Sequence, residues 1–200
     1  FGDWGTGADG GGGSLELIDA SIDNNLASNW QTSWTFGGTP GAANSTEPTA
    51  MVTTIYNVQH TTSADGMSTM AGEYVQVSGI VTGTDNVGNS SAFAIQDGSG
   101  PWTGIYCYWS HFSNCGEDSI NVGDEVTVRG TVAEYVSFGG DTTKTFTQLS
   151  SGRIVSVNSS GNVLPDAVTL ALEDVADEQY EGVRVTTGGR VVEAAVCESG

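Results

Sequence analysis

Short blocks in which apolar and polar residues alternate constrain the fold of this chain more than any other feature. The blocks with this texture are residues 74–82, 91–96, 104–109, 124–135, and 144–149 together with 153–157, which are expected to form one strand. Successive side chains of a strand point to opposite faces, so a period of two predicts strands with one buried face. Gly, Asn and Asp separate the blocks at short intervals. The pattern therefore predicts an all-β protein, either a barrel or a sandwich.

Two glycines, Gly79 and Gly130, fall inside the strongest predicted strands. Interior glycines mark the bulges and bends by which small barrels coil. Five strands with such glycines, and a longer insertion after the third strand, indicate an OB-fold-like β-barrel. We expect regular strands from Thr54 onward, and the one helix candidate is the short acidic stretch 169–179.

Composition divides the chain into four parts. They are a Gly-rich unit at 1–44, a Ser/Thr/Pro/Ala linker at 45–53, the barrel at 54–160, and an acidic segment with additional strands at 161–200, where a further β unit could begin. The first part is too short and too Gly-rich to bury a core of its own. Because the chain starts at Phe1 and stops at Gly200 just after a strand-like run, we expect both ends to be cut from a longer polypeptide.

The first 44 residues resemble the C-terminal part of a bacterial lamin-tail domain. The matching motifs, in order, are Gly10 to Ile18, Asp23 to Asn25, Asn29, Trp30 and Gly38 to Asn44. The resemblance implies a partial immunoglobulin-like β-sandwich, of a kind found on secreted proteins and often beside nuclease domains.

Residues 54–196 resemble OB-like domains of secreted bacterial nucleases. The matching motifs are Ile55-Tyr-Asn-Val-Gln, Val77-x-Gly79-Ile-Val, Phe93-x-Ile-Gln-Asp97, Gly104-Ile, Val122-Gly-Asp-x-Val-x-Val-x-Gly130, Glu134-Tyr135 and Glu181-Gly-Val-Arg-Val. In that family, catalysis lies in a separate downstream domain that needs paired histidines. This chain has only His60 and His111, so we expect these 200 residues to have no catalytic residues of their own.

Nucleic acid is the partner that an OB-fold suggests first, because such folds stack bases on aromatic rings and follow the backbone with positive charge. The candidate stacking aromatics are Trp102, Tyr106, Tyr108, Trp109 and Phe112, with Tyr106 and Tyr108 predicted on the face opposite Ile105 and Cys107. The candidate phosphate contacts are Arg129, Lys144 and Arg153. A formal net charge of −19, from 24 acidic and 5 basic side chains, argues against a strong polyanion clamp.

Three cysteines occur, and Cys107 and Cys115 frame an aromatic loop. We expect them to form a disulfide that closes this loop. The alternative is a metal site that includes His111, but structural zinc usually takes four ligands at shorter cysteine spacings. Cys197 is left over, to pair elsewhere or to stay reduced.

Calcium suits an acidic surface because it prefers carboxylate and carbonyl oxygens. Candidate ligands are Asp19 and Asp23 in one loop, and Asp85 with Asp97 in the barrel. The alternative, which the spacing favours, is that these residues cap turns with their side chains. No other cofactor is indicated.

The location and role follow from the same features. An acidic surface with one lysine stays hydrated in salty water, so we expect a bacterial protein that is extracellular or lies at the cell surface. No apolar run is long enough to span a membrane.

The favoured function is a non-catalytic extracellular module of a secreted nuclease-type protein, which positions substrate or attaches to a surface. The alternative is a structural subunit of an extracellular fibre or surface assembly, joined to copies of itself by β-strand complementation through residues 14–18.

Overall fold

A computed structural model describes residues 8, 12–35, 37–45, 48–87, 90–109, 120–136 and 145–189. Five long strands make the main sheet: β4 (Tyr74–Val87), β5 (Ser90–Gln96), β6 (Gly104–Trp109), β7 (Glu125–Val136) and β8 (Thr145–Ser159). Each overlaps a block that the period of two predicts, so the all-β prediction is confirmed. A two-residue strand, β3 (Met51–Val52), pairs in parallel with the start of β4.

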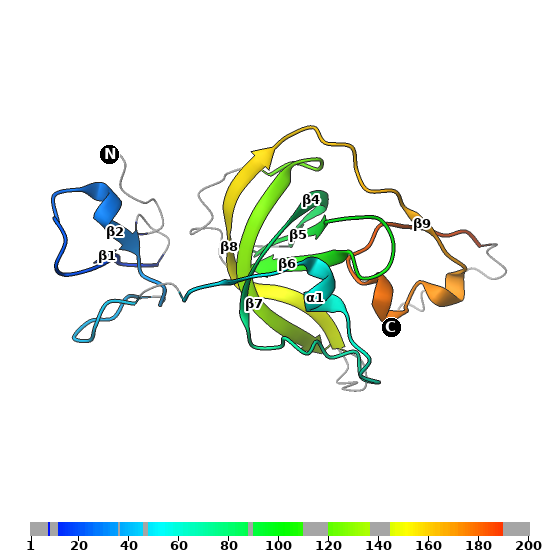
Figure 1. Cartoon of the computed structure of the whole chain (residues 1–200), viewed down its shortest axis with the longest axis horizontal. Coiled ribbons are helices and arrows are strands. Elements are labelled where there is room, and N and C mark those ends of the chain that lie inside the picture. Colours follow the sequence, from blue (N-terminus) through cyan, green and yellow to red (C-terminus); the bar gives the residue numbers. More distant parts are fainter. Residues whose placement is uncertain are drawn as a thin grey trace, which may run out of the picture.

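The strand order makes the sheet a closed barrel. The order is β4-β5-β6-β8-β7, and β4 also pairs with β7, so the last strand returns to the first. Among these five strands all neighbours are antiparallel except β6 and β8, which run parallel. Five strands closed in this Greek-key order form an OB-like barrel, as the glycine pattern predicts (Figure 1).

Gly79 and Gly130 lie where the barrel strands bend. Near Gly79, β4 changes partner from β7 to β5, and a Cβ on Gly79 would lie 2.9 Å from the carbonyl oxygen of Gln96. At Gly130 the register between β7 and β8 slips between Arg129 and Thr131. Both glycines therefore allow a close approach of backbones at a bend, which confirms the sequence prediction.

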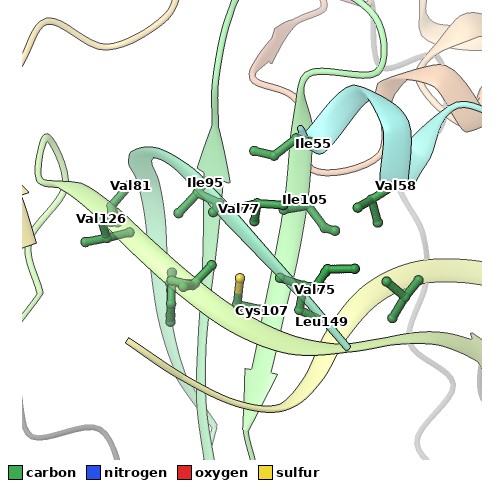
Figure 2. Packing of buried hydrophobic residues seen from close by; sticks show 13 residues of the cluster. Ile55, Val58, Val75, Val77, Val81, Ile95, Ile105, Cys107, Val126 and Leu149 are labelled. Carbon is green, nitrogen blue, oxygen red and sulfur yellow. The ribbon is translucent and has the colours of Figure 1, made fainter. Parts of the chain in front are cut away.

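The core fills the barrel with the inward residues of all five strands. Residues such as Val77, Ile95, Ile105, Val128 and Leu149 are fully buried or nearly so. Figure 2 shows four of these side chains, Val77, Ile95, Ile105 and Leu149, gathered among the barrel strands. The other members of the cluster are Ile55, Val58, Val75, Val81, Phe93, Cys107, Val126 and Val132.

One α-helix, α1 (Ile55–Gln59), covers an end of the barrel, and the sequence analysis missed it. The Thr54 side chain caps it by accepting a hydrogen bond from the Asn57 N–H, and Ile55 and Val58 enter the core at a helical spacing. The expected helix at 169–179 is wrong. That stretch holds the end of β9 (Val168–Thr169) and two 3-10 turns, η4 (Leu172–Asp174) and η5 (Glu178–Tyr180), followed by β10 (Val185–Thr186), which pairs with β9.

The N-terminal unit is a small antiparallel pair, β1 (Leu15–Leu17) and β2 (Trp30–Thr32), joined through η2 (Ala27–Asn29). It lies to one side of the barrel, and the segment after β8 lies on the other (Figure 1). The ring of Trp34 meets that of Tyr74 edge to face, with centroids 5.0 Å apart. Of the helices among the described residues, none has the length and apolar character needed to cross a membrane.

Candidate ligand-binding face

The outward side chains of β6 are tyrosines. Ile105 and Cys107 are fully buried in the core, and strand alternation therefore turns Tyr106 and Tyr108 outward. Tyr108 is 36% exposed, and Tyr106 is partly buried. The opposite placement of these two pairs of residues was predicted from the sequence, and the burial confirms it.

Two further rings lie on the neighbouring strands. Tyr135 of β7 and Phe146 of β8 are partners in the antiparallel register, and Tyr135 is 42% exposed. Tyr106 meets Phe146 edge to face, with ring centroids 5.7 Å apart. The parallel pairing of β6 and β8 brings these rings together, because it aligns Tyr106 with Gln148, two residues beyond Phe146.

We call the part of the outward surface that surrounds these rings the aromatic face. Its residues are Ala92 and Ala94 of β5, Tyr106 and Tyr108 of β6, Arg129, Thr131, Ala133 and Tyr135 of β7, and Phe146, Gln148, Ser150 and Arg153 of β8. Small side chains such as Ala94 and Ala133 lie between the rings, and Ala92 is only 3% exposed.

The electrostatics of this face differ from those of the whole chain. None of the residues that define the aromatic face is acidic, although the chain carries 24 acids, and Glu125 lies on the same side of β7 four residues before Arg129. Arg129 and Arg153, two of the five basic residues, are register partners across β7 and β8. Arg129 Nε also donates to Gln76 Oε1 at 2.8 Å, which orients the guanidinium. The face therefore combines rings with local positive charge.

A carboxylate cluster lies beside one end of this face. Glu181 Oε2 accepts a hydrogen bond from the Thr147 N–H at 3.0 Å, and Glu134 Oε1 accepts one from Thr147 Oγ1 at 3.0 Å. Burial raises the pKa of Glu181 to about 8, and the nearby carboxylates of Glu178 and Glu134 add to that rise. Glu181 is thus largely protonated at neutral pH.

Comparisons with known proteins add modest similarities to this picture. No family model matches the chain, and neither does any curated protein. Among solved structures, a replication protein A heterotrimer bound to single-stranded DNA matches with 17% identity and a TM-score of 0.34, over 55% of this chain and 83% of that one. A putative nucleic acid-binding lipoprotein from Klebsiella pneumoniae matches with 19% identity and a TM-score of 0.28, over 46% of this chain and 78% of that one.

An aspartyl-tRNA synthetase from Entamoeba histolytica matches with 14% identity and a TM-score of 0.33, over 47% of this chain. The match spans only 20% of the synthetase's own length. Because the identities and TM-scores of these matches are low, we assign the fold from the strand order of the barrel itself. The lamin-tail and secreted-nuclease resemblances of the sequence gain no support from these comparisons.

The structure separates Trp102 from the aromatic face. Trp102 precedes β6. Its ring meets that of His60 edge to face, with ring centroids 5.3 Å apart, and the His60 ring stacks on that of Tyr56 with centroids 4.9 Å apart. Its φ of 65° is a left-handed conformation that is rare for a bulky residue, and its N–H donates to the Gln179 carbonyl at 2.7 Å. The side chain of Trp109 and all of Phe112 and Lys144 lie outside the described residues.

Cys107 belongs to the barrel core, where its side chain is fully buried (Figure 2). Cys115, His111 and Cys197 lie outside the described residues, so the disulfide between Cys107 and Cys115 stays a prediction.

Two of the candidate calcium ligands make side-chain turns. Asp19 Oδ1 accepts the N–H and Oγ of Ser21, each at 2.7 Å, and Asp23 Oδ1 accepts the N–H and Nδ2 of Asn25, each at 2.9 Å. These are the capped turns that the sequence favoured. Asp97 Oδ2 accepts the Ile55 N–H at 3.2 Å, and the side chain of Asp85 is outside the described set. Within the described part of the chain, no three His, Cys, Asp or Glu side chains gather as metal ligands would. Calcium binding stays a prediction.

The segment expected to complement a neighbouring molecule already has a partner. β1 pairs with β2 of its own chain, and the Ser33 N–H donates to the Ser14 carbonyl at 2.7 Å. Self-association through residues 14–18 stays a prediction.

Sequence reasoning missed Tyr135 and Phe146 as members of the face. Both fall in correctly predicted strands, but nothing local in the sequence shows that β8 lies between β6 and β7. A signal was present in the alternation of residues 129–135, which turns Tyr135 to the same side of β7 as Arg129.

Proposed function

We propose that this chain is a non-catalytic binding module whose aromatic face holds single-stranded nucleic acid by ring stacking. The observation that carries the proposal is the contrast between the face and the chain: in a protein of net charge −19, the aromatic face bears two arginines and no acid. Stacking of bases on aromatic rings is tolerant of sequence, because every base has a π-face. The ligand is therefore expected to be bound with little sequence preference.

The overall negative charge does not preclude this ligand at physiological salt. The screening length there is about 8 Å, so acids farther away than this act only weakly on a bound strand. Within the face the charges are those of Arg129 and Arg153. The carboxylate cluster around Glu181 lies beside the other end, next to Phe146, so the phosphates are expected to run over the arginines. At low salt the distant acids are screened less, and their repulsion opposes binding.

Single substitutions in the face test the proposal. Tyr106→Ala and Phe146→Ala should each weaken binding of a fluorescent deoxythymidine oligomer, measured by anisotropy at 0.15 M salt. Loss of one stacking ring costs about 1–3 kcal/mol, or roughly 5- to 150-fold in affinity. Tyr56→Ala is the matched control, since Tyr56 is 46% exposed but lies on α1 outside the face.

The outcomes separate the ligand classes. OB-folds also bind oligosaccharides, so a neutral oligosaccharide is titrated in parallel. Binding of the oligosaccharide with the same ring dependence, and none of the deoxythymidine oligomer, would overturn the nucleic-acid assignment. Equal losses in Tyr56→Ala and Tyr106→Ala would overturn the assignment of the face.

We also propose that the module belongs to a secreted nuclease-type protein and positions substrate for, or anchors, a catalytic domain outside this chain. The ordered lamin-tail and OB-like motifs and the lysine-poor acidic composition support this. The full-length gene product tests it. A signal peptide and a downstream catalytic domain are expected, and a gene product with neither would contradict the proposal.

A further inference from the structure

A short segment crosses the start of β6 with its backbone against that of the strand. We call residues 178–184 the strap. A Cβ on Gly104 would lie 2.3 Å from the Gly182 carbonyl carbon, and a Cβ on Gly182 would lie 2.7 Å from the Ile105 nitrogen. Gly182 also has a φ of +67°, a conformation that other residues rarely adopt. Contact this close requires a glycine on both sides.

The strap covers the end of the aromatic face. Gln96 and Gly104 are register partners on the outward side of β5 and β6, and the next outward pair is Ala94 with Tyr106. Gln96 is nevertheless fully buried, and its Oε1 accepts the Arg184 N–H at 2.8 Å. The surface that starts at Tyr106 would therefore continue over Gln96 and Gly104 if the strap were absent.

Glu181 holds the strap to β8 from the other side. Its Oε2 accepts the Thr147 N–H, one residue before the first aligned pair of β6 and β8. The titratable groups that face it are Glu178 of the strap and Glu134 of β7, both acidic. The loop before β4 adds the Ser68 N–H, which donates to Glu134, and Gly66, which lies against the Glu178 carboxylate.

We propose that the strap is a proton-controlled cover: it stays docked while Glu181 holds a proton and lifts when Glu181 ionises, which lengthens the aromatic face. Three carboxylates in one place tolerate one neutral member far better than three charges. The docking step is independent of any ligand, whereas the gain in ligand-binding surface rests on the proposed function.

The direction of the pH dependence follows from burial, which raises the pKa of docked Glu181 to about 8, above the ordinary value of 4.5. The docked state therefore binds the proton more tightly than the open state. Docking is strongest below the ordinary pKa, weakens by up to about tenfold per pH unit above it, and levels off above about 8.

Amide hydrogen exchange of the intact chain tests the cover. Protection of residues 178–184 and 102–105, corrected for the intrinsic rate at each pH, should fall between pH 5 and 8.5. Glu181→Gln should keep the strap protected throughout, because an amide does not ionise. Gly182→Ala should lose protection at every pH, and Glu173→Gln, an exposed acid of η4, should behave like the wild type.

Constant protection of the wild-type strap across this range, or a pH-dependent loss that persists in Glu181→Gln, would overturn the cover. Binding of the deoxythymidine oligomer is measured on the same proteins. Exchange that follows Glu181 with no binding at any pH sustains the cover and contradicts the proposed function. Binding of the oligomer with no pH-dependent change in strap exchange sustains the proposed function and contradicts the cover.

Discussion

Glu16 shows how one buried carboxylate organises the N-terminal unit. It is 5% exposed, and its two oxygens accept hydrogen bonds from Ser14, Thr39 and Ser45. Gly38 lies against Ser14, where a Cβ would be 2.3 Å from the serine Oγ. Two of the motifs found in the sequence, Gly10 to Ile18 and Gly38 to Asn44, are thus joined through this one side chain.

Acid should loosen this unit. Burial raises the pKa of Glu16, but the hydrogen bonds from Thr39, Ser45 and Ser14 together outweigh it and leave the pKa below its usual value. The unit is therefore fully stabilised above the ordinary glutamate pKa and loses that stability as the pH falls through the lowered one. Protection of the Ile18 and Ser33 amides, corrected for the intrinsic exchange rate at each pH, should fall below pH 4.5 in the wild type.

Glu16→Gln should show this loss of protection already at pH 7. The glutamine side chain would place an N–H donor against the N–H and O–H donors that surround the Glu16 carboxylate. Glu173→Gln is the control with an exposed acid, and its exchange at Ile18 and Ser33 should match the wild type. Wild-type protection of these amides in Glu16→Gln would show that the carboxylate does not organise the unit.

Strands and their bends are the scale at which the sequence was most informative. The period of two predicted every long strand, and Gly79 and Gly130 marked the places where the barrel bends. The register could not be predicted, because pairing of β8 with both β6 and β7 depends on contacts between distant residues. For the same reason Tyr135 and Phe146 were missed, while Tyr106 and Tyr108, on a single strand, were found. The helix α1 was missed because five residues are too few to show a period.

The bend at Gly79 gives a prediction with an internal control. Gly79→Ala places a methyl group 2.9 Å from the Gln96 carbonyl oxygen, whereas Gly83→Ala on the same strand meets nothing within 4 Å. Overpacking of this kind costs about 1–3 kcal/mol. Thermal unfolding should therefore show a melting temperature lowered by several degrees for Gly79→Ala and little changed for Gly83→Ala. Equal effects would mean that the close approach is unimportant.

Over the whole molecule the net charge is −19, whereas the aromatic face carries two arginines. The salt dependence of binding should report the number of these arginines that contact phosphates, because each phosphate neutralised by a basic group contributes a slope of about −0.7 for single strands. Two arginines on the face predict a plot of log affinity against log salt no steeper than roughly −1.4. Arg129→Gln and Arg153→Gln should each make the slope shallower by about 0.7, and a steep slope that neither changes would place the phosphates elsewhere.

The most direct test of the central claim is an NMR titration of the labelled protein with an unlabelled deoxythymidine oligomer at 0.15 M salt. If the aromatic face binds the oligomer, amide shift changes will concentrate on β6, the second half of β7 and the start of β8, around Tyr106, Tyr135 and Phe146. Shift changes centred on α1 and Trp102, or no changes at millimolar oligomer, would contradict the claim that the aromatic face binds nucleic acid.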